Sequence, residues 1–109
     1  MKQEFIRTNI FKEDWNNAGL NDDDLIELEN LLLKNPKAGT VIPGLSGGRK
    51  VRFMAKGKGK SGGIRIVYID ITLKDHIYLL LAYTKGVQSD LSSEQKQLVN
   101  KLIHELKGN

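Results

Sequence analysis

Two apolar segments rich in β-branched residues constrain the fold more than any other feature of the sequence. Residues Ile64–Ile71 and Ile77–Thr84 are separated only by a short polar stretch around Lys74, Asp75 and His76. Runs of this length and composition are typical of buried strands, and a short polar connection between two of them predicts an antiparallel hairpin. We therefore expect this hairpin to form the centre of a sheet.

Helical patterns flank the hairpin on both sides. Asn21 is a good N-cap, three aspartates follow it in the first turn, and leucines then recur at helical spacing until Asn35-Pro36. Ser92 to Gln95 reads as a capping box before a second amphipathic helix. The remaining expected elements are a short strand over 3–10, a short helix over 12–18, an irregular connection over 37–48 and a strand over 49–55.

The resulting order, β-α-α-β-β-β-α, predicts an α+β fold with a small, mostly antiparallel sheet, two N-terminal helices and a C-terminal helix. A chain of 109 residues is long enough for one modest core, so we expect a single domain over residues 1–109.

Positive charge is concentrated in one third of the chain. Residues 1–35 hold four Lys/Arg and eight Asp/Glu, residues 36–69 hold eight Lys/Arg and no acid, and residues 70–109 hold five of each. Such a block is either a solvated surface or the footprint of a polyanion such as nucleic acid.

The basic block contains an alternating strand and a Lys/Gly loop. In the expected strand over 49–55, Val51 and Phe53 point one way and Lys50 and Arg52 the other. Arg65 is costly to bury unless it is paired, for example with Asp70 or Asp90, or faces a solvated cleft. We expect Lys50, Arg52 and Arg65 to line one groove.

The loop itself, KGKGKSGG over 56–63, ends like a phosphate-binding P-loop at Gly59-Lys60-Ser61. That motif requires a glycine where Met54 stands and a helix where a strand follows, so we reject it. Lys56, Lys58 and Lys60 either keep a hairpin connection soluble or guide RNA phosphates.

Other classes of chemistry find little support in the sequence. No cysteine is present, which excludes disulfides, thiolate metal sites and a thiol nucleophile. We expect no metal and no cofactor, and both histidines, His76 and His104, to be ordinary surface residues. The N-terminus lacks a signal-peptide core and no run is long enough to span a bilayer, so we expect a cytoplasmic protein that does not bind membranes.

Residues 35–95 resemble the RelE/ParE superfamily of bacterial toxins, and specifically its HigB-type branch. The likeness consists of a basic strand ahead of a Lys/Gly-rich loop, a Gly-x-Arg-Ile-x-Tyr strand, a later strand ending in Tyr-x-Lys, and Asp-Leu-Ser after it. These correspond to Arg49–Arg52, the loop at 56–63, Gly63–Tyr68, Tyr83–Lys85 and Asp90–Ser92.

The resemblance implies a toxin of a type II toxin-antitoxin system that cuts mRNA in the ribosomal A site. It implies metal-independent cleavage by the substrate 2′-hydroxyl, with clustered cations stabilising the transition state. The catalytic residues would be Arg65, Lys50, Arg52 and Lys85, and the RNA-binding residues Lys56, Lys58, Lys60, Arg49 and Tyr83. It also implies a bacterial host and a helix-turn-helix antitoxin of the HigA type.

One departure from the family pattern bears on proton transfer. RelE members carry a tyrosine at the start of the C-terminal segment, where this chain has Leu91-Ser92. Tyr83 or Tyr68 could substitute for it, and Lys50 or Lys58 are alternative bases. Two other functions stay open: a ParE-like DNA gyrase poison and an RNA-binding module without catalysis.

Overall fold

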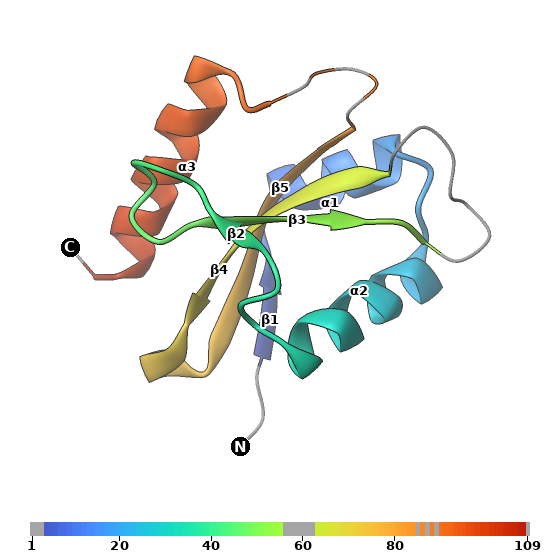
Figure 1. Ribbon diagram of the computed structural model, residues 1–109, viewed down its shortest axis with the longest axis horizontal. Helices are drawn as coiled ribbons and strands as arrows, with labels where there is room; N and C mark the ends of the chain where they lie inside the picture. Colours follow the sequence, from blue (N-terminus) through green and yellow to red (C-terminus); the bar gives the residue numbers. More distant parts are fainter. Residues whose placement is uncertain (1–3, 56–62, 85, 87, 89, 109) are drawn as a thin grey trace.

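A computed structural model describes residues 4–55, 63–84, 86, 88 and 90–108. Five strands of this part form one sheet in the order β1-β5-β4-β3-β2 (Figure 1). The only parallel pair among them joins β1 to β5, so the sheet is mostly antiparallel, as predicted. The strands are β1 (Glu4–Arg7), β2 (Thr40–Val41), β3 (Arg49–Phe53), β4 (Ile64–Ile71) and β5 (His76–Thr84).

Three α-helices pack on the two faces of the sheet. Figure 1 shows α1 (Asn9–Asn17) and α2 (Asp22–Lys34) on one side and α3 (Ser93–Leu106) on the other. The predicted caps are present: Asn21 and Asp24 form a capping box at α2, and Ser92 and Gln95 form one at α3. Each box satisfies two backbone N–H groups that would otherwise lack a partner.

The buried side chains divide into two clusters, one on each face. The cluster under α1 and α2 contains Phe11, Trp15 and Phe53, whose rings stack in sequence, together with Ile64, Ile66 and Tyr68. The cluster under α3 contains Val67, Ile69, Tyr83, Leu91, Val99 and Ile103. Alternate residues of β4 therefore enter opposite clusters, as expected of a central strand buried on both sides.

The structure corrects the expected element order in one place, and it defines the turn expected between the two long strands. The connection over 37–48 was expected to be irregular, but Thr40 and Val41 pair with Lys50 and Arg49 and add β2 at the sheet edge. Two residues are too few for a periodic pattern, so the sequence carries no signal for this strand. Before β5, Thr72–Lys74 forms a 3₁₀ turn (η1), and Asp75 adopts a left-handed conformation with φ 54°.

A buried tyrosine fixes the path from α2 to β2. The hydroxyl of Tyr68, which is fully buried, donates to the Pro36 carbonyl at 2.8 Å and accepts from the Gly39 N–H at 3.0 Å. Arg49 donates from Nη1 to the Gly39 carbonyl at 2.7 Å. Gly39 has no room for a side chain, because a Cβ there would lie 2.5 Å from the Lys50 carbonyl oxygen.

Within the described ranges, no helix has both the length and the apolar character needed to cross a membrane.

Candidate active site

A row of three side chains crosses the sheet at the end where β4 begins. Arg52 of β3 is paired with Arg65 of β4, which is in turn paired with Tyr83 of β5. Directly paired residues project from the same face with their Cβ atoms about 4.5–5.5 Å apart. Lys50 stands two residues before Arg52 and so projects from that face as well. The structure thus brings together Lys50, Arg52, Arg65 and Tyr83, and we name this group the basic row.

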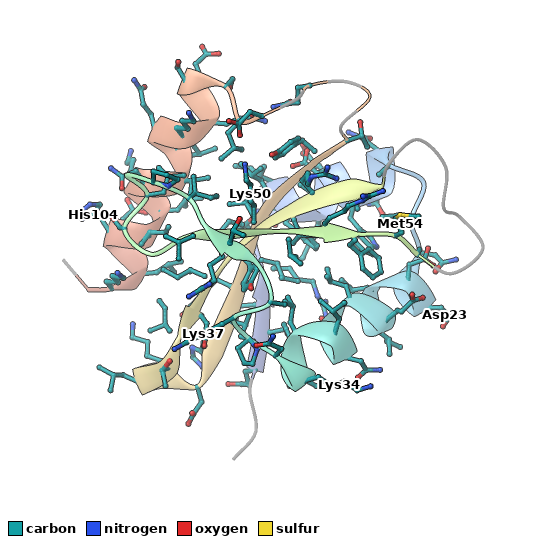
Figure 2. All side chains as sticks on the ribbon, viewed as in Figure 1. Asp23, Lys34, Lys37, Lys50, Met54 and His104 are labelled. Carbon is teal, nitrogen blue, oxygen red and sulfur yellow. The ribbon has the colours of Figure 1, made fainter. Side chains whose placement is uncertain are left out.

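The basic row lies on the face that α3 covers. Farther along the same face, Val67 and Leu81 belong to the cluster packed against α3, and so does Tyr83. Arg52 is exposed, whereas Lys50 and Arg65 are half-buried. Figure 2 shows Lys50 near the middle of the view, where β2 lies over β3, and Met54 at the far end of β3.

An acidic residue from the segment before α3 faces the basic row. The Lys50 ammonium Nζ lies 3.5 Å from the Asp90 carboxylate Oδ1, and the Asp90 side chain is about half exposed. The Leu91 backbone N–H donates to Asp90 at 2.7 Å, and this bond, together with Lys50 and Lys96, holds the pKa of the Asp90 carboxyl below its usual value. Asp90 therefore connects the basic row to the start of α3.

The phenol of Tyr83 lies in an environment that keeps it protonated. It is 6% exposed, and burial raises the pKa of its phenol, with Asp90 raising it further and Arg65 lowering it. A tyrosine whose pKa is raised above 10 stays protonated at neutral pH. In this environment the hydroxyl can hydrogen-bond to a phosphate oxygen or protonate a leaving group.

Not every predicted site residue joins the basic row. Arg49 pairs with Tyr68 and points to the α1–α2 face, where its guanidinium is held by the Gly39 carbonyl. This places it across the sheet from Lys50 and Arg52. Lys85 and the three loop lysines, Lys56, Lys58 and Lys60, lie outside the described residues.

The structure separates the two tyrosines, Tyr68 and Tyr83, that the sequence offered as substitutes for the tyrosine of RelE proteins. Tyr68 is fully buried on the opposite face, with its hydroxyl engaged by Pro36 and Gly39, so it cannot reach a substrate at the basic row. Leu91 is buried in the cluster under α3, and Ser92 caps that helix. Of the two tyrosines considered, Tyr83 alone lies in the row.

Both histidines are remote from the row. His76 is the first residue of β5, and its Nε2 lies 3.1 Å from Glu4 Oε1 of β1. His104 is on the exposed side of α3 (Figure 2). Asp22, Asp23 and Asp24 occupy the first turn of α2, as predicted. Among the described residues, no three His, Cys, Asp or Glu side chains are grouped so that they could hold a metal ion.

These features define a small α+β domain whose sheet carries a cationic cross-strand row beside its C-terminal helix. No protein-family model matches the chain. Solved structures of the E. coli toxin RelE, however, superpose on 75–94% of this chain.

A free-state RelE variant with two arginines replaced by alanine gives a TM-score of 0.61 at 18% identity, covering 94% of this chain and 99% of that one. Isolated RelE gives 0.54 at 16% identity, covering 92% and 98%. RelE from the intact RelBE toxin-antitoxin complex gives 0.55 at 17% identity, covering 75% and 95%. The chain therefore has the fold of the RelE toxins, which confirms the predicted fold.

Proposed function

We propose that this protein is the toxin of a type II toxin-antitoxin system and cleaves mRNA in the ribosomal A site. The observation that carries the proposal is the basic row, where Arg52, Arg65 and Tyr83 occupy one line across a RelE-like sheet. The RelE structures are those of a toxin, and two of them are complexes with its antitoxin or a peptide of it. The sequence motifs favour the HigB-type branch within this class.

Cleavage by the RNA 2′-hydroxyl requires three catalytic contributions from the protein. The 2′-oxygen must lose a proton, the phosphorane oxygens must be stabilised, and the leaving 5′-oxygen must be protonated. Arg52 and Arg65 suit the second task, because the guanidinium fork matches the geometry of phosphate oxygens. Preorganised cations of this kind often supply the largest single contribution to catalysis.

The other members of the row have complementary roles in this proposal. Lys50 adds a third cation and is oriented by the Asp90 carboxylate at 3.5 Å. Tyr83, protonated at neutral pH, hydrogen-bonds the scissile phosphate or protonates the leaving oxygen. Lys85, which follows the strand predicted over 77–84, completes the catalytic group. Lys56, Lys58 and Lys60 guide RNA phosphates to this group. The protein needs no metal or cofactor for this reaction.

A toxin with this activity needs a partner that neutralises it. We propose a cognate antitoxin of the helix-turn-helix HigA type, and the cytoplasm of a bacterium as the place of action. RelE itself is found with the antitoxin RelB in a solved complex. The HigA type follows from the sequence resemblance to the HigB branch.

The decisive test is Arg65→Ala, with Arg7→Ala as the matched control. Both variants lose one positive charge, but Arg7 lies on the edge strand β1, two strands from the β4 strand of Arg65, and it pairs with Glu29 of α2 at 3.1 Å. On induction in bacteria, the wild-type protein and Arg7→Ala should arrest growth and produce new mRNA 5′ ends in frame with codons. Arg65→Ala should do neither while remaining folded, as judged by a cooperative unfolding transition.

The alternatives give different results in the same experiment. DNA damage with intact mRNA would identify a gyrase poison of the ParE kind. Binding to programmed ribosomes without cleavage would leave a plain RNA-binding module. Full cleavage by a folded Arg65→Ala variant would refute the site.

A further inference from the structure

The side chain of Gln88 joins the segment after β5 to the start of α3. Its Nε2 atom donates one hydrogen bond to the Asp90 carbonyl at 2.6 Å and another to Gln95 Oε1 at 2.7 Å. A primary amide has two N–H donors, so both are used. The Gln88 backbone N–H donates to the carbonyl of Thr84, the last residue of β5, at 3.1 Å. Gln88 therefore connects the end of β5 to both Asp90 and α3.

The acceptor on α3 is itself fixed in place. Gln95 Oε1 accepts the Ser92 N–H at 2.9 Å, and the Gln95 N–H donates to the Ser92 hydroxyl at 3.1 Å. These two bonds form the capping box of α3. Because Gln95 Oε1 cannot turn away without breaking the box, it holds the Gln88 amide in one orientation.

These bonds determine where the carboxylate of Asp90 lies. Its Oδ1 atom accepts the Leu91 N–H at 2.7 Å, and the same atom lies 3.5 Å from the Lys50 Nζ. The Asp90 side chain is 53% exposed, so burial alone does not hold it. Leu91, in contrast, is buried in the cluster under α3. The direction of the carboxylate toward Lys50 therefore depends on the two backbone groups beside it, the Leu91 N–H and the carbonyl that Gln88 binds.

We propose that Gln88 is a positioning residue of the basic row: its amide holds Asp90 where the carboxylate orients Lys50. The inference rests on the function proposed above and adds to it a residue that does not touch the substrate. A cation stabilises a transition state best when it is oriented before the reaction begins, because no reorganisation is then needed. The Lys50 ammonium stands on a flexible four-carbon chain, so it gains more from such a partner than an arginine does.

Gln88→Glu is the sharpest substitution, because it keeps the size of the side chain and removes both donors. The new carboxylate would face the Asp90 carbonyl and Gln95 Oε1, two acceptors to which it cannot donate. Gln97→Glu is the matched control, since it makes the same change of charge and size at an exposed position of α3.

The first readout is cleavage of mRNA on programmed ribosomes by the full chain. Gln88→Glu should lower kcat about tenfold and leave KM within about twofold, because the arginines that bind phosphate are unchanged. Gln97→Glu should match the wild type. In an Asp90→Ala background, Gln88→Glu should cause no further loss, since a positioning residue acts only through the residue that it positions. A loss of folded protein would instead lower cleavage in both backgrounds.

The second readout does not require nuclease activity. Three groups hold the pKa of the Asp90 carboxyl below its usual value: the Leu91 N–H, Lys50 and Lys96. In Gln88→Ala, which adds no charge, this pKa, followed by NMR of the carboxyl carbon, should rise toward the ordinary 3.8. Gln97→Ala should leave it lowered. Tyr83 also interacts with Asp90, but its own pKa is raised above 10, so it stays protonated over this pH range.

Each outcome bears on the inference. An unchanged Asp90 pKa in Gln88→Ala, wild-type kcat in Gln88→Glu, or an equal loss of kcat with and without Asp90 would overturn it, provided that urea unfolding of the variant is cooperative. A raised Asp90 pKa in Gln88→Ala, in a protein whose wild type cuts no mRNA, would support the role of Gln88 in holding Asp90 and would overturn the nuclease.

Discussion

Removing the hydroxyl of Tyr68 is the strongest single test of how this fold is stabilised. Tyr68→Phe removes one oxygen and leaves the ring in place in the core. It deprives the Gly39 N–H and the Pro36 carbonyl of their partner in a region where Tyr68 is fully buried and Gly39 is buried. Each buried polar group left unsatisfied costs about 1–3 kcal/mol. Because Pro36 is half-buried, we expect a total near the lower end, about 2–3 kcal/mol.

The assay is urea unfolding followed by tryptophan fluorescence, because Trp15 is buried in the cluster that contains Tyr68. In a thermal scan, a loss of about 2–3 kcal/mol should lower the melting temperature by roughly 8–24 °C, given about 4–8 °C per kcal/mol for a domain of about this length. Tyr78→Phe is the control. Its hydroxyl has a single partner among the described residues, His76 Nδ1 at 3.2 Å, so we expect a loss below about 1 kcal/mol.

The raised pKa of Tyr68 predicts that the folded protein loses stability at alkaline pH. Burial raises the pKa of Tyr68 above 10, against lowering contributions from the Gly39 bond and Arg49. Above pH 10 the unfolded chain loses this proton while the folded chain keeps it, so stability falls as pH rises. Tyr68→Phe should flatten part of that slope. Equal losses of stability for Tyr68→Phe and Tyr78→Phe, or an unchanged pH dependence in Tyr68→Phe, would refute this account of the Tyr68 hydrogen bonds.

Three further substitutions probe other parts of the fold, each by urea unfolding. Trp15→Ala removes a 4% exposed ring stacked on Phe53 and should cost about 3–5 kcal/mol; a loss below 1 would contradict the packing described. Asn21→Ala breaks the capping box with Asp24 and should cost about 1 kcal/mol, whereas no measurable loss would mean that the box is dispensable. Gly39→Ala places a methyl group 2.5 Å from the Lys50 carbonyl oxygen and should cost about 1–3 kcal/mol of stability. Wild-type stability in this variant would show that the backbone around Gly39 can move without cost.

Local chemistry accounts for most of the elements that the sequence predicted correctly. The hairpin of β4 and β5 follows from two apolar runs with a polar connection, and α2 and α3 follow from capping boxes placed before apolar stripes. The helix predicted over 12–18 begins earlier, at Asn9, because the Thr8 side chain accepts the Phe11 N–H and caps it. The sequence analysis missed β2 because its two residues are held by pairing with β3 and by the hydrogen bonds of Tyr68 to Pro36 and Gly39. Two residues show no pattern of their own.

The candidate site divides in the same way. Alternation within β3 was enough to predict that Lys50 and Arg52 share a face, since the side-chain period of a strand is two residues. That Arg65 shares this face depends on the pairing of β3 with β4. The sequence could not set the register that pairs Arg52 with Arg65 and Arg65 with Tyr83. Nor could it place Arg49 on the far face, anchored to Gly39.

The sequence by itself determined which local elements the chain forms and their order: a cationic segment, a buried hairpin and two capped helices. What the tertiary structure decided is which of these residues meet. Asp90 reaches Lys50, and Asp14 reaches the free edge of β5, across separations of 40 and 68 positions in the chain. Such contacts depend on strand register and on where β1 ends, which are set by the packing of all the elements together and leave no local pattern in the sequence.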